Sequence, residues 1–218
     1  MNLQEAIKEM QNSMLSDIPE ETRNIMMNAT EKLIQSGIDK NAKKAGDKIP
    51  DFTLPNSRGE EIAVSNLLKE GPLVISFYRG AWCPYCNLEF KALNEAYPAI
   101  RECGAELIAI SPNLREKTAQ FAAENPFQFD IFSDEGNQVA KQFGLVFTLP
   151  EELRPIYEQF GIHIPDYNGP DNYDIPIPAT YIVNTDGAIV HAYVNPDYTQ
   201  RMEPDEIVSI LQKMRGEN

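Results

Sequence analysis

Residues 77–86, with the sequence FYRGAWCPYC, join an apolar run to a long segment of helical periodicity. The run at residues 73–78, LVISFY, is rich in β-branched and aromatic side chains, which predicts a buried strand. Gly80 ends this strand, and the helical pattern opens around Cys83 and Cys86. The two cysteines are therefore expected where a strand turns into a helix.

A Cys-x-x-Cys pair at the start of a helix favours thiol redox chemistry. The first helical turn offers unpaired backbone N–H groups and the positive end of the helix dipole, which stabilise a thiolate. One sulfur can then attack a substrate while the other closes a disulfide. Pro84 suits the first turn, where its missing N–H costs nothing. The alternatives are a structural staple or half a zinc site, for which only Cys103, His163 and His191 remain as distant ligands.

Length and charge narrow the class of protein. A chain of 218 residues is enough for one domain with an appendage. Nineteen basic residues against 33 acidic ones give a formal net charge of −14, which disfavours nucleic acid and anionic membrane surfaces as partners. The acidic, amphipathic start lacks the features of a secretory signal, and no run reaches the length of a membrane span. Three cysteines in such a chain favour a reducing compartment, so a cytoplasmic location is expected.

Residues 1–45 are expected to form a helical extension. Apolar side chains recur at helical spacing from Leu3 to about Gly37, with a break at Pro19, which predicts a helical pair. Five of the seven methionines lie within the first 27 residues. Such adaptable side chains suit packing onto the core, or alternatively a docking or dimer surface.

Residues 46–218 are expected to form the main domain. Strands alternate with helical segments, which indicates parallel strands joined by right-handed crossovers. Pro98 is expected to kink the helix after Cys86 or to shift its end. Cys103 is expected to lie buried and inert on the apolar face of that helix, with a resolving role as the alternative. Further strands are predicted at residues 52–55, 61–64, 106–110 and 129–132, with helices at 114–125, 137–143 and 204–214.

The alternation of strands and helical segments stops between residues 145 and 178. Six of the sixteen prolines fall there, among aromatic and acidic residues. This segment is too apolar for a disordered linker, so we expect an ordered loop insertion that walls one side of the active site. Two further strands are predicted at residues 180–183 and 188–194, and Asp186-Gly187 between them predicts that they form a hairpin.

This order of elements is similar to the thioredoxin fold. More narrowly, residues 77–86, together with PATYIV at 178–183 and DYTQR at 197–201, resemble the peroxiredoxin-like branch of the alkyl hydroperoxide reductase and thiol-specific antioxidant (AhpC/TSA) superfamily. The resemblance covers about residues 46 to 214. It implies an α/β, thioredoxin-like fold with a mixed central sheet flanked by helices, to which the helical extension is added.

The resemblance bears on the roles of the cysteines. Peroxiredoxins carry a Pro-x-x-x-Thr-x-x-Cys signature, and by position Cys86 falls on their peroxidatic cysteine, Cys83 on the threonine and Arg79 on the proline. Pro178 stands where peroxiredoxins have an arginine and thioredoxins a cis proline. The attacking cysteine of thioredoxins matches Cys83. The resemblance thus favours Cys86 as peroxidatic and Cys83 as resolving, and it leaves the reverse assignment open.

The neighbours of the dithiol are further candidates. Arg79 is expected to stabilise a thiolate or a peroxide oxygen, with a solvated arginine as the alternative. Trp82 and Tyr85 are expected to shape access to the sulfur atoms, or simply to pack. The Ile177-Pro178 bond is a candidate for a cis peptide, with a trans turn proline as the alternative. Arg201 is a candidate site residue only because of the family-like run around it, since the residues alone indicate an exposed charge in a loop.

The resemblance implies a thiol-dependent peroxidase for hydrogen peroxide or organic hydroperoxides, without metal or organic cofactor. A thiolate at the 83/86 site becomes a sulfenic acid, the second cysteine condenses with it, and thioredoxin or a similar dithiol protein restores both. The first alternative is a general thiol-disulfide oxidoreductase in which Cys83 attacks. The second is a non-catalytic redox-sensing or binding module. Because peroxiredoxin-like proteins often self-associate, a homodimer is also an expectation.

Overall fold

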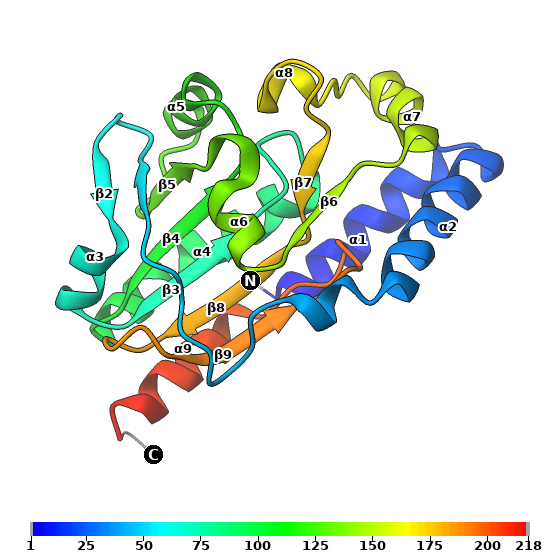
Figure 1. Cartoon of the computed structure of the whole chain (residues 1–218). Helices are drawn as coiled ribbons and strands as arrows, with labels where there is room; N and C mark the ends of the chain where they lie inside the picture. The colour runs from blue at the N-terminus through cyan, green and yellow to red at the C-terminus, as the bar shows by residue number, and fades with distance from the viewer. Residues whose placement is uncertain (1, 217–218) are drawn as a thin grey trace.

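A five-stranded sheet forms the centre of the protein in the computed structural model, which describes residues 2–216 (Figure 1). Its strand order is β5-β4-β3-β8-β9. The pairs β3·β4 and β4·β5 are parallel, whereas β8 is antiparallel to both β3 and β9. The expected mixed sheet and its hairpin are confirmed. The bounds are β3 (Leu73–Phe77), β4 (Glu106–Ser111), β5 (Asp130–Ser133), β8 (Ala179–Val183) and β9 (Ile189–Val194).

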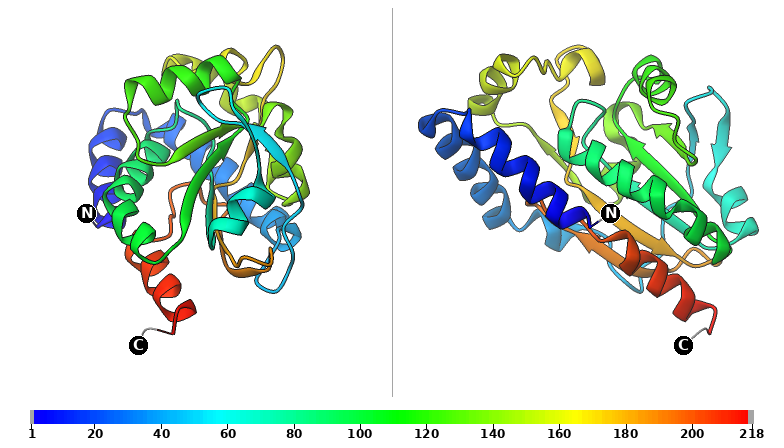
Figure 2. Two further views of the ribbon diagram at one scale, coloured as in Figure 1. Left: turned by 90° about the vertical axis from the view of Figure 1, so that its left-hand side faces the viewer. Right: turned by 180° about the vertical axis from the view of Figure 1, so that it is seen from behind.

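The central strand β3 is buried on both faces, because its alternating side chains enter two separate cores. Val74 packs with the apolar sides of α4 and α9, whereas Leu73, Ile75 and Phe77 pack with α3 and α6. Seen from behind, α4 and α9 lie across one face of the sheet together with α1 (Figure 2). The covering helices are α3 (Val64–Glu70), α4 (Pro84–Glu102), α6 (Gln138–Gln142) and α9 (Pro204–Met214).

The helical pair predicted at the N-terminus is present as α1 (Leu3–Ser16) and α2 (Glu20–Ser36). The two helices lie side by side in every view (Figures 1 and 2). Pro19 precedes α2, and Gly37 ends it in the left-handed conformation, at φ 68°. The short 3-10 helix η1 (Ile38–Asn41) then leads to the main domain.

The first helix is fixed to the main domain at its N-terminal end. Leu3 and Ile7 are buried against Ala92 of α4. The carboxylate of Glu203 accepts hydrogen bonds from the backbone N–H groups of Leu3 and Gln4, at 3.1 and 2.8 Å. Glu203 thereby satisfies two of the N–H groups that the start of a helix leaves unpaired. The start of α1 therefore packs on α4 and is hydrogen-bonded to the segment that leads into α9.

Pro98 lies inside α4 and does not end it. Its missing N–H leaves the carbonyl of Asn94, four residues earlier, without its helical partner. Gln128 fills the gap, because its Nε2 donates to the Asn94 carbonyl at 3.0 Å while its backbone N–H donates to Asn94 Oδ1 at 2.8 Å. Cys103 follows the helix directly and is buried, as predicted.

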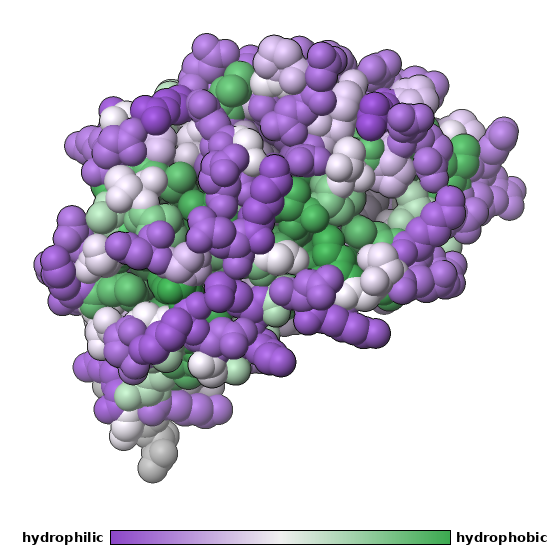
Figure 3. All heavy atoms as spheres, in the orientation of Figure 1, coloured by the Kyte–Doolittle hydropathy of each residue, from purple (hydrophilic) through white to green (hydrophobic). Residues whose placement is uncertain are grey.

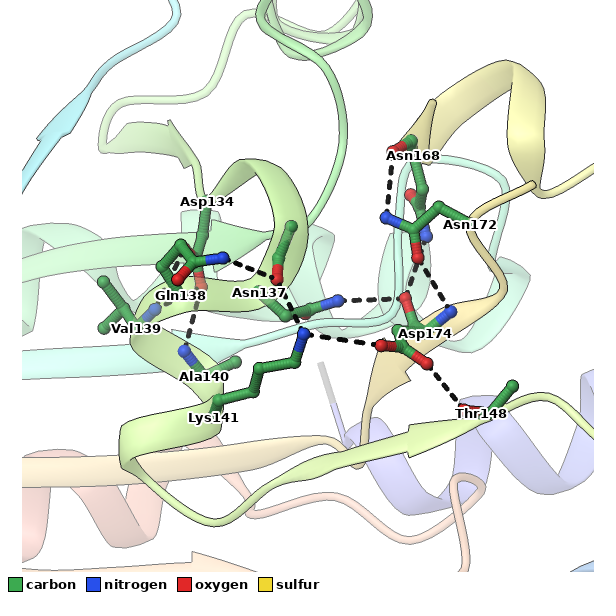
Figure 4. A network of polar contacts seen from close by, with 11 residues as sticks. Asp134, Asn137, Gln138, Val139, Ala140, Lys141, Thr148, Asn168, Asn172 and Asp174 are labelled. Atoms are coloured by element: carbon green, nitrogen blue, oxygen red, sulfur yellow. Dashed lines mark hydrogen bonds and ion pairs between the residues drawn. The ribbon is translucent and has the colours of Figure 1, made fainter. Parts of the chain in front are cut away.

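The segment at residues 145–178 is ordered and tied to the main domain by polar contacts around Asp174 (Figure 4). The Asp174 carboxylate accepts from Thr148 Oγ1 at 2.6 Å and lies 3.5 Å from Lys141 Nζ. Its carbonyl accepts from the side-chain amides of Asn137 and Asn168, at 3.0 and 3.1 Å. These contacts join β6 (Val146–Thr148), β7 (Asp174–Pro176) and α8 (Pro165–Asn168) to α6, and the helix α7 (Arg154–Gln159) lies between β6 and α8 in the chain.

The remaining elements surround the sheet. Within residues 2–216, no helix combines the length and the apolar character needed to cross a membrane. The bounds are β1 (Thr53–Pro55), β2 (Glu61–Ala63), α5 (Arg115–Glu124), η2 (Glu135–Asn137), β6 (Val146–Thr148), η3 (Glu151–Leu153), α7 (Arg154–Gln159), α8 (Pro165–Asn168) and β7 (Asp174–Pro176).

Candidate active site

The two cysteines of the motif lie where β3 passes into α4, as the sequence predicts. Cys83 is the N-cap residue of α4, Pro84 is the first residue of that helix, and Cys86 lies in its first turn. Neither forms a disulfide, and only 0% and 1% of their surface is exposed. The helix start therefore places its free N–H groups and its positive dipole end beside Cys83.

The loop before the cysteines is held by glycine and by a buried amide. Gly80 has a φ of 150°, and a Cβ at this position would collide with Trp82 Nε1, so that only glycine lets the indole lie so close. The Ala81 N–H donates to Asn113 Oδ1 at 2.9 Å. Asn113 Nδ2 in turn donates to Asn168 Oδ1 at 2.9 Å. The loop is thus connected through Asn113 to the segment at residues 145–178.

Arg79 is the first of two buried arginines at the dithiol. Only 3% of it is exposed, so the alternative of a solvated arginine is wrong. Its Nη1 lies 3.9 Å from Cys83 Sγ, and its Nη2 donates to Tyr157 Oη at 2.5 Å. The guanidinium also lies over the rings of Trp82 and Tyr198, at 4.9 and 4.3 Å from their centroids. Aromatic rings therefore shield the Arg79 charge from water and direct it at Cys83.

Arg201 is the second buried arginine and lies beside Cys86. Its Nε donates to Glu89 Oε2 at 2.7 Å, and its Nη2 lies 3.5 Å from Cys86 Sγ. The two charged side chains are only 2% and 3% exposed. The expectation of an exposed loop charge is wrong, because Nη1 also donates to the backbone carbonyls of Tyr198 and Gln200, which draw the side chain inward.

The surroundings shift the pKa values of the two thiols in opposite directions. Burial on its own raises the pKa of Cys83, but hydrogen bonds from Cys86 and the charges of Arg79 and Arg201 outweigh it and lower that pKa to about 5. The pKa of Cys86 is raised well above its ordinary value by burial and by the hydrogen bond and charge of Cys83. The surroundings therefore favour the thiolate form on Cys83 and the thiol form on Cys86.

The ion pair of Arg201 and Glu89 is expected to carry a large part of the stability. Glu89→Met should lower the free energy of unfolding by about 3–5 kcal/mol, because it leaves a guanidinium buried without its carboxylate. Urea unfolding of the reduced protein measures this change. Glu61→Met is the matched control, since Glu61 pairs with Arg115 in solvent and its loss should cost less than about 1 kcal/mol.

The companion variant Glu89→Met/Arg201→Met removes both buried charges and should recover much of the lost stability. Equal unfolding free energies for Glu89→Met and Glu61→Met would contradict a structural role for the buried pair.

Two of the remaining predicted residues belong to the aromatic surroundings of Arg79. The ring of Trp82 lies edge-on to Tyr157, with centroids 5.8 Å apart, and Tyr85 lies edge-on to Tyr198 at 5.3 Å. Trp82 is nearly buried and Tyr85 half-buried. Both therefore lie between Cys83 and the surface.

Pro178 is buried at the junction of β7 and β8, next to the Ala179 that pairs with Phe77. The expected cis bond is wrong, because every peptide bond between residues 2 and 216 is trans. The backbone explains this outcome. The chain passes from β7 into β8 with only Ile177 and Pro178 between them, and the Ile177 N–H donates to the Leu145 carbonyl at 2.8 Å. There is no tight turn here for a cis proline to form.

Sequence reasoning missed three side chains of the site: Glu89, Tyr157 and Tyr198. Glu89 follows Cys86 by three residues on one helix, and this spacing places the two on the same face. Tyr198 lies inside the family-like run at residues 197–201. Tyr157 gives no local signal, because it lies 78 residues from Arg79 in the chain and reaches it only through the placement of α7.

Comparisons with known proteins identify the family of the chain. The model of the AhpC/TSA family matches residues 45–192. Peroxiredoxin Bcp of Escherichia coli (strain K12) is 29% identical over 153 residues, which cover 70% of this chain and 86% of that protein. The chloroplastic peroxiredoxin Q of Sedum lineare is 28% identical over 170 residues, 78% of each chain.

The crystal structure of peroxidoxin BcpB from Mycobacterium tuberculosis is similar with a TM-score of 0.62 and 26% identity, over 79% of this chain and 98% of that one. The family match excludes α1 and α2, which precede residue 45. It includes both cysteines of the motif and most of the sheet. The chain therefore belongs to the AhpC/TSA family and is a peroxiredoxin-like, thiol-dependent peroxidase with a thioredoxin fold.

Proposed function

We propose that Cys83 is the thiolate that attacks the peroxide and that Cys86 resolves the product. The observation that carries this proposal is the environment of Cys83. It caps a helix, receives hydrogen bonds from Cys86 and faces Arg79, so that its pKa is lowered to about 5. A thiol with this pKa is almost fully ionised at neutral pH, and the thiolate is the nucleophilic form.

The reaction proceeds in two steps in this proposal. The Cys83 thiolate attacks one peroxide oxygen, the O–O bond breaks, and the leaving oxygen takes up a proton to depart as water or an alcohol. Cys83 is then a sulfenic acid. Cys86 attacks the oxidised sulfur, its proton leaves with the hydroxyl group as water, and a Cys83–Cys86 disulfide forms. Arg79 supports the first step, because its charge stabilises the negative charge that develops on the peroxide oxygens.

This assignment reverses the one that the peroxiredoxin signature favours, and the second arginine supports the reversal. Arg201 contacts Cys86 Sγ but is also paired with the Glu89 carboxylate, which offsets its charge. Arg79 has no carboxylate within ion-pairing distance in the described residues and binds the Tyr157 hydroxyl instead. The full charge of Arg79 therefore acts on Cys83, and for this reason the pKa values of the two thiols differ.

A thioredoxin-type dithiol protein is the proposed reductant. It would supply the two electrons and two protons that convert the disulfide back to thiols. Reducing partners of this kind operate where glutathione and thioredoxin keep thiols reduced, which supports a cytoplasmic site of action.

The test couples the reduced protein to thioredoxin, thioredoxin reductase and NADPH. We expect NADPH oxidation that depends on peroxide, and peptide mapping of the oxidised protein should give one disulfide, between Cys83 and Cys86. Cys103→Ser is the control and should turn over like the wild type, because Cys103 lies at the other end of α4. Reduction of protein disulfides without turnover of peroxide would instead establish the general oxidoreductase.

A further inference from the structure

The helices α1 and α2 lie outside the family match, and they build one wall of a cleft over the dithiol. The cleft has a volume of about 640 Å³, within the range of small-molecule sites. On its other side lie the end of α7 and the segment at residues 197–199. At its inner end it reaches Arg79 and Trp82, the side chains that cover Cys83.

We propose that this cleft binds the apolar substituent of an uncharged organic hydroperoxide. The helical pair would then make the enzyme selective for bulky hydroperoxides over hydrogen peroxide. This inference rests on the proposed function, since it assigns a substrate class to the same Cys83.

The apolar character of the cleft is the first observation in its favour. Of the five large apolar side chains that are exposed in the described residues, four line it: Met14, Met27, Ile34 and Phe160, which are 39%, 68%, 46% and 42% exposed. Exposed apolar side chains gathered in one place mark a binding surface more often than scattered ones do. Methionine side chains also adapt to ligands of different shape.

The inner end of the cleft is lined by Arg79, whose Nη1 lies beside Cys83 Sγ. Arg79 Nε is a buried N–H donor without a hydrogen-bond partner among residues 2–216. A hydroperoxide group carries two oxygens that can accept such bonds. Polar donors next to Cys83 and apolar side chains further out match a molecule with one polar end and an apolar body.

The charges in the cleft favour an uncharged ligand. Two basic side chains, Arg23 and Arg79, are balanced by two acidic ones, Glu31 and Asp197, so the lining carries no net charge. The whole chain is strongly acidic, with a formal charge of −14, and this field repels anionic ligands. A neutral aryl or alkyl hydroperoxide meets both conditions.

A second opening explains why hydrogen peroxide should not depend on this cleft. A hollow of about 430 Å³ on the other side of α2, bordered by β6 and η3, also reaches Arg79 and Tyr157. Figure 3 shows apolar surface in the hollow between α2 and β6. A small peroxide can therefore approach Arg79 without contacting the methionines of the first cleft.

The test compares Met27→Glu with Asn24→Glu. Both positions lie exposed on α2, but only Met27 lines the cleft, so the two variants add the same charge to the same helix. For Met27→Glu we expect kcat/KM with cumene hydroperoxide to fall roughly tenfold, because the apolar body loses its contact surface. The value with hydrogen peroxide should change less than about twofold, and Asn24→Glu should behave like the wild type with both substrates.

A binding measurement without turnover accompanies the kinetics. Cys83→Ser protein is titrated with 2-phenyl-2-propanol, the alcohol product of cumene hydroperoxide, and the fluorescence of Trp82 at the inner end of the cleft is followed. Saturable binding that Met27→Glu weakens supports the inference. Absence of binding, or an equal effect of Met27→Glu on both peroxides, overturns it and leaves the peroxidase intact. A wild-type protein that reduces neither peroxide overturns the proposed function as well.

Discussion

Cys83→Ser is expected to lower kcat/KM for peroxide by at least about a thousandfold, as the loss of a catalytic nucleophile does in other enzymes. The reason is the unequal ionisation of the two thiols. Cys83 has a pKa lowered to about 5, whereas Cys86 has a raised pKa and is protonated at neutral pH. In the variant, burial and the Glu89 carboxylate still raise the pKa of Cys86, so the remaining thiol supplies little thiolate. Peroxide consumption by the reduced variant, compared with Cys103→Ser, measures the effect.

The companion variant Cys86→Ser should keep the first step and stop after it. Its Cys83 should be oxidised at a rate close to that of the wild type and persist as a sulfenic acid, detected as the added mass of one oxygen atom and by a sulfenic-acid-specific dimedone label. The opposite outcome, in which Cys83→Ser accumulates a sulfenic acid on Cys86, would assign the roles as the peroxiredoxin signature does.

Arg79→Gln should raise the pKa of Cys83 and slow its reaction at neutral pH. The guanidinium favours the charged thiolate, so its removal shifts the pKa upward, by about one to three units for a neighbouring charge of this kind. The rate of a thiolate falls as the pH drops through its pKa, so the midpoint of the pH profile should move from about 5 to higher pH. Loss of a preorganised donor to the peroxide adds a decrease on the order of 100-fold.

Alkylation of Cys83 by iodoacetamide, followed against pH, reports the midpoint without involving peroxide. Arg115→Gln serves as the control, because Arg115 pairs with Glu61 on the surface. An unmoved midpoint in Arg79→Gln would refute the assignment of Arg79 as the residue that ionises Cys83.

The fold was predictable because its signals are local. The β-branched run of β3, the glycine after it and the helical spacing of α4 each depend on neighbouring residues, and together they place Cys83 and Cys86 correctly. The break at Pro19 between α1 and α2 is local in the same way.

The surroundings of the dithiol were less predictable, because distant segments bring them together. Arg201 reaches Glu89 across 112 residues and Arg79 reaches Tyr157 across 78. Neither contact gives a recognisable spacing in the sequence, so the local residues predict an exposed Arg201 and no role for Tyr157. The cis bond at Pro178 was carried over from thioredoxins, and the continuous passage of the chain from β7 into β8 excludes it.

The role of Cys83 as the attacking thiolate is tested most directly by stopped-flow fluorescence of Trp82, the only tryptophan, after reduced protein is mixed with hydrogen peroxide. The experiment is repeated from acidic to neutral pH. We expect a rate constant orders of magnitude above that of an ordinary free thiol, with a pH midpoint of about 5, and its loss in Cys83→Ser. A rate no better than that of a free thiol, or a fast phase that survives in Cys83→Ser, would contradict this role.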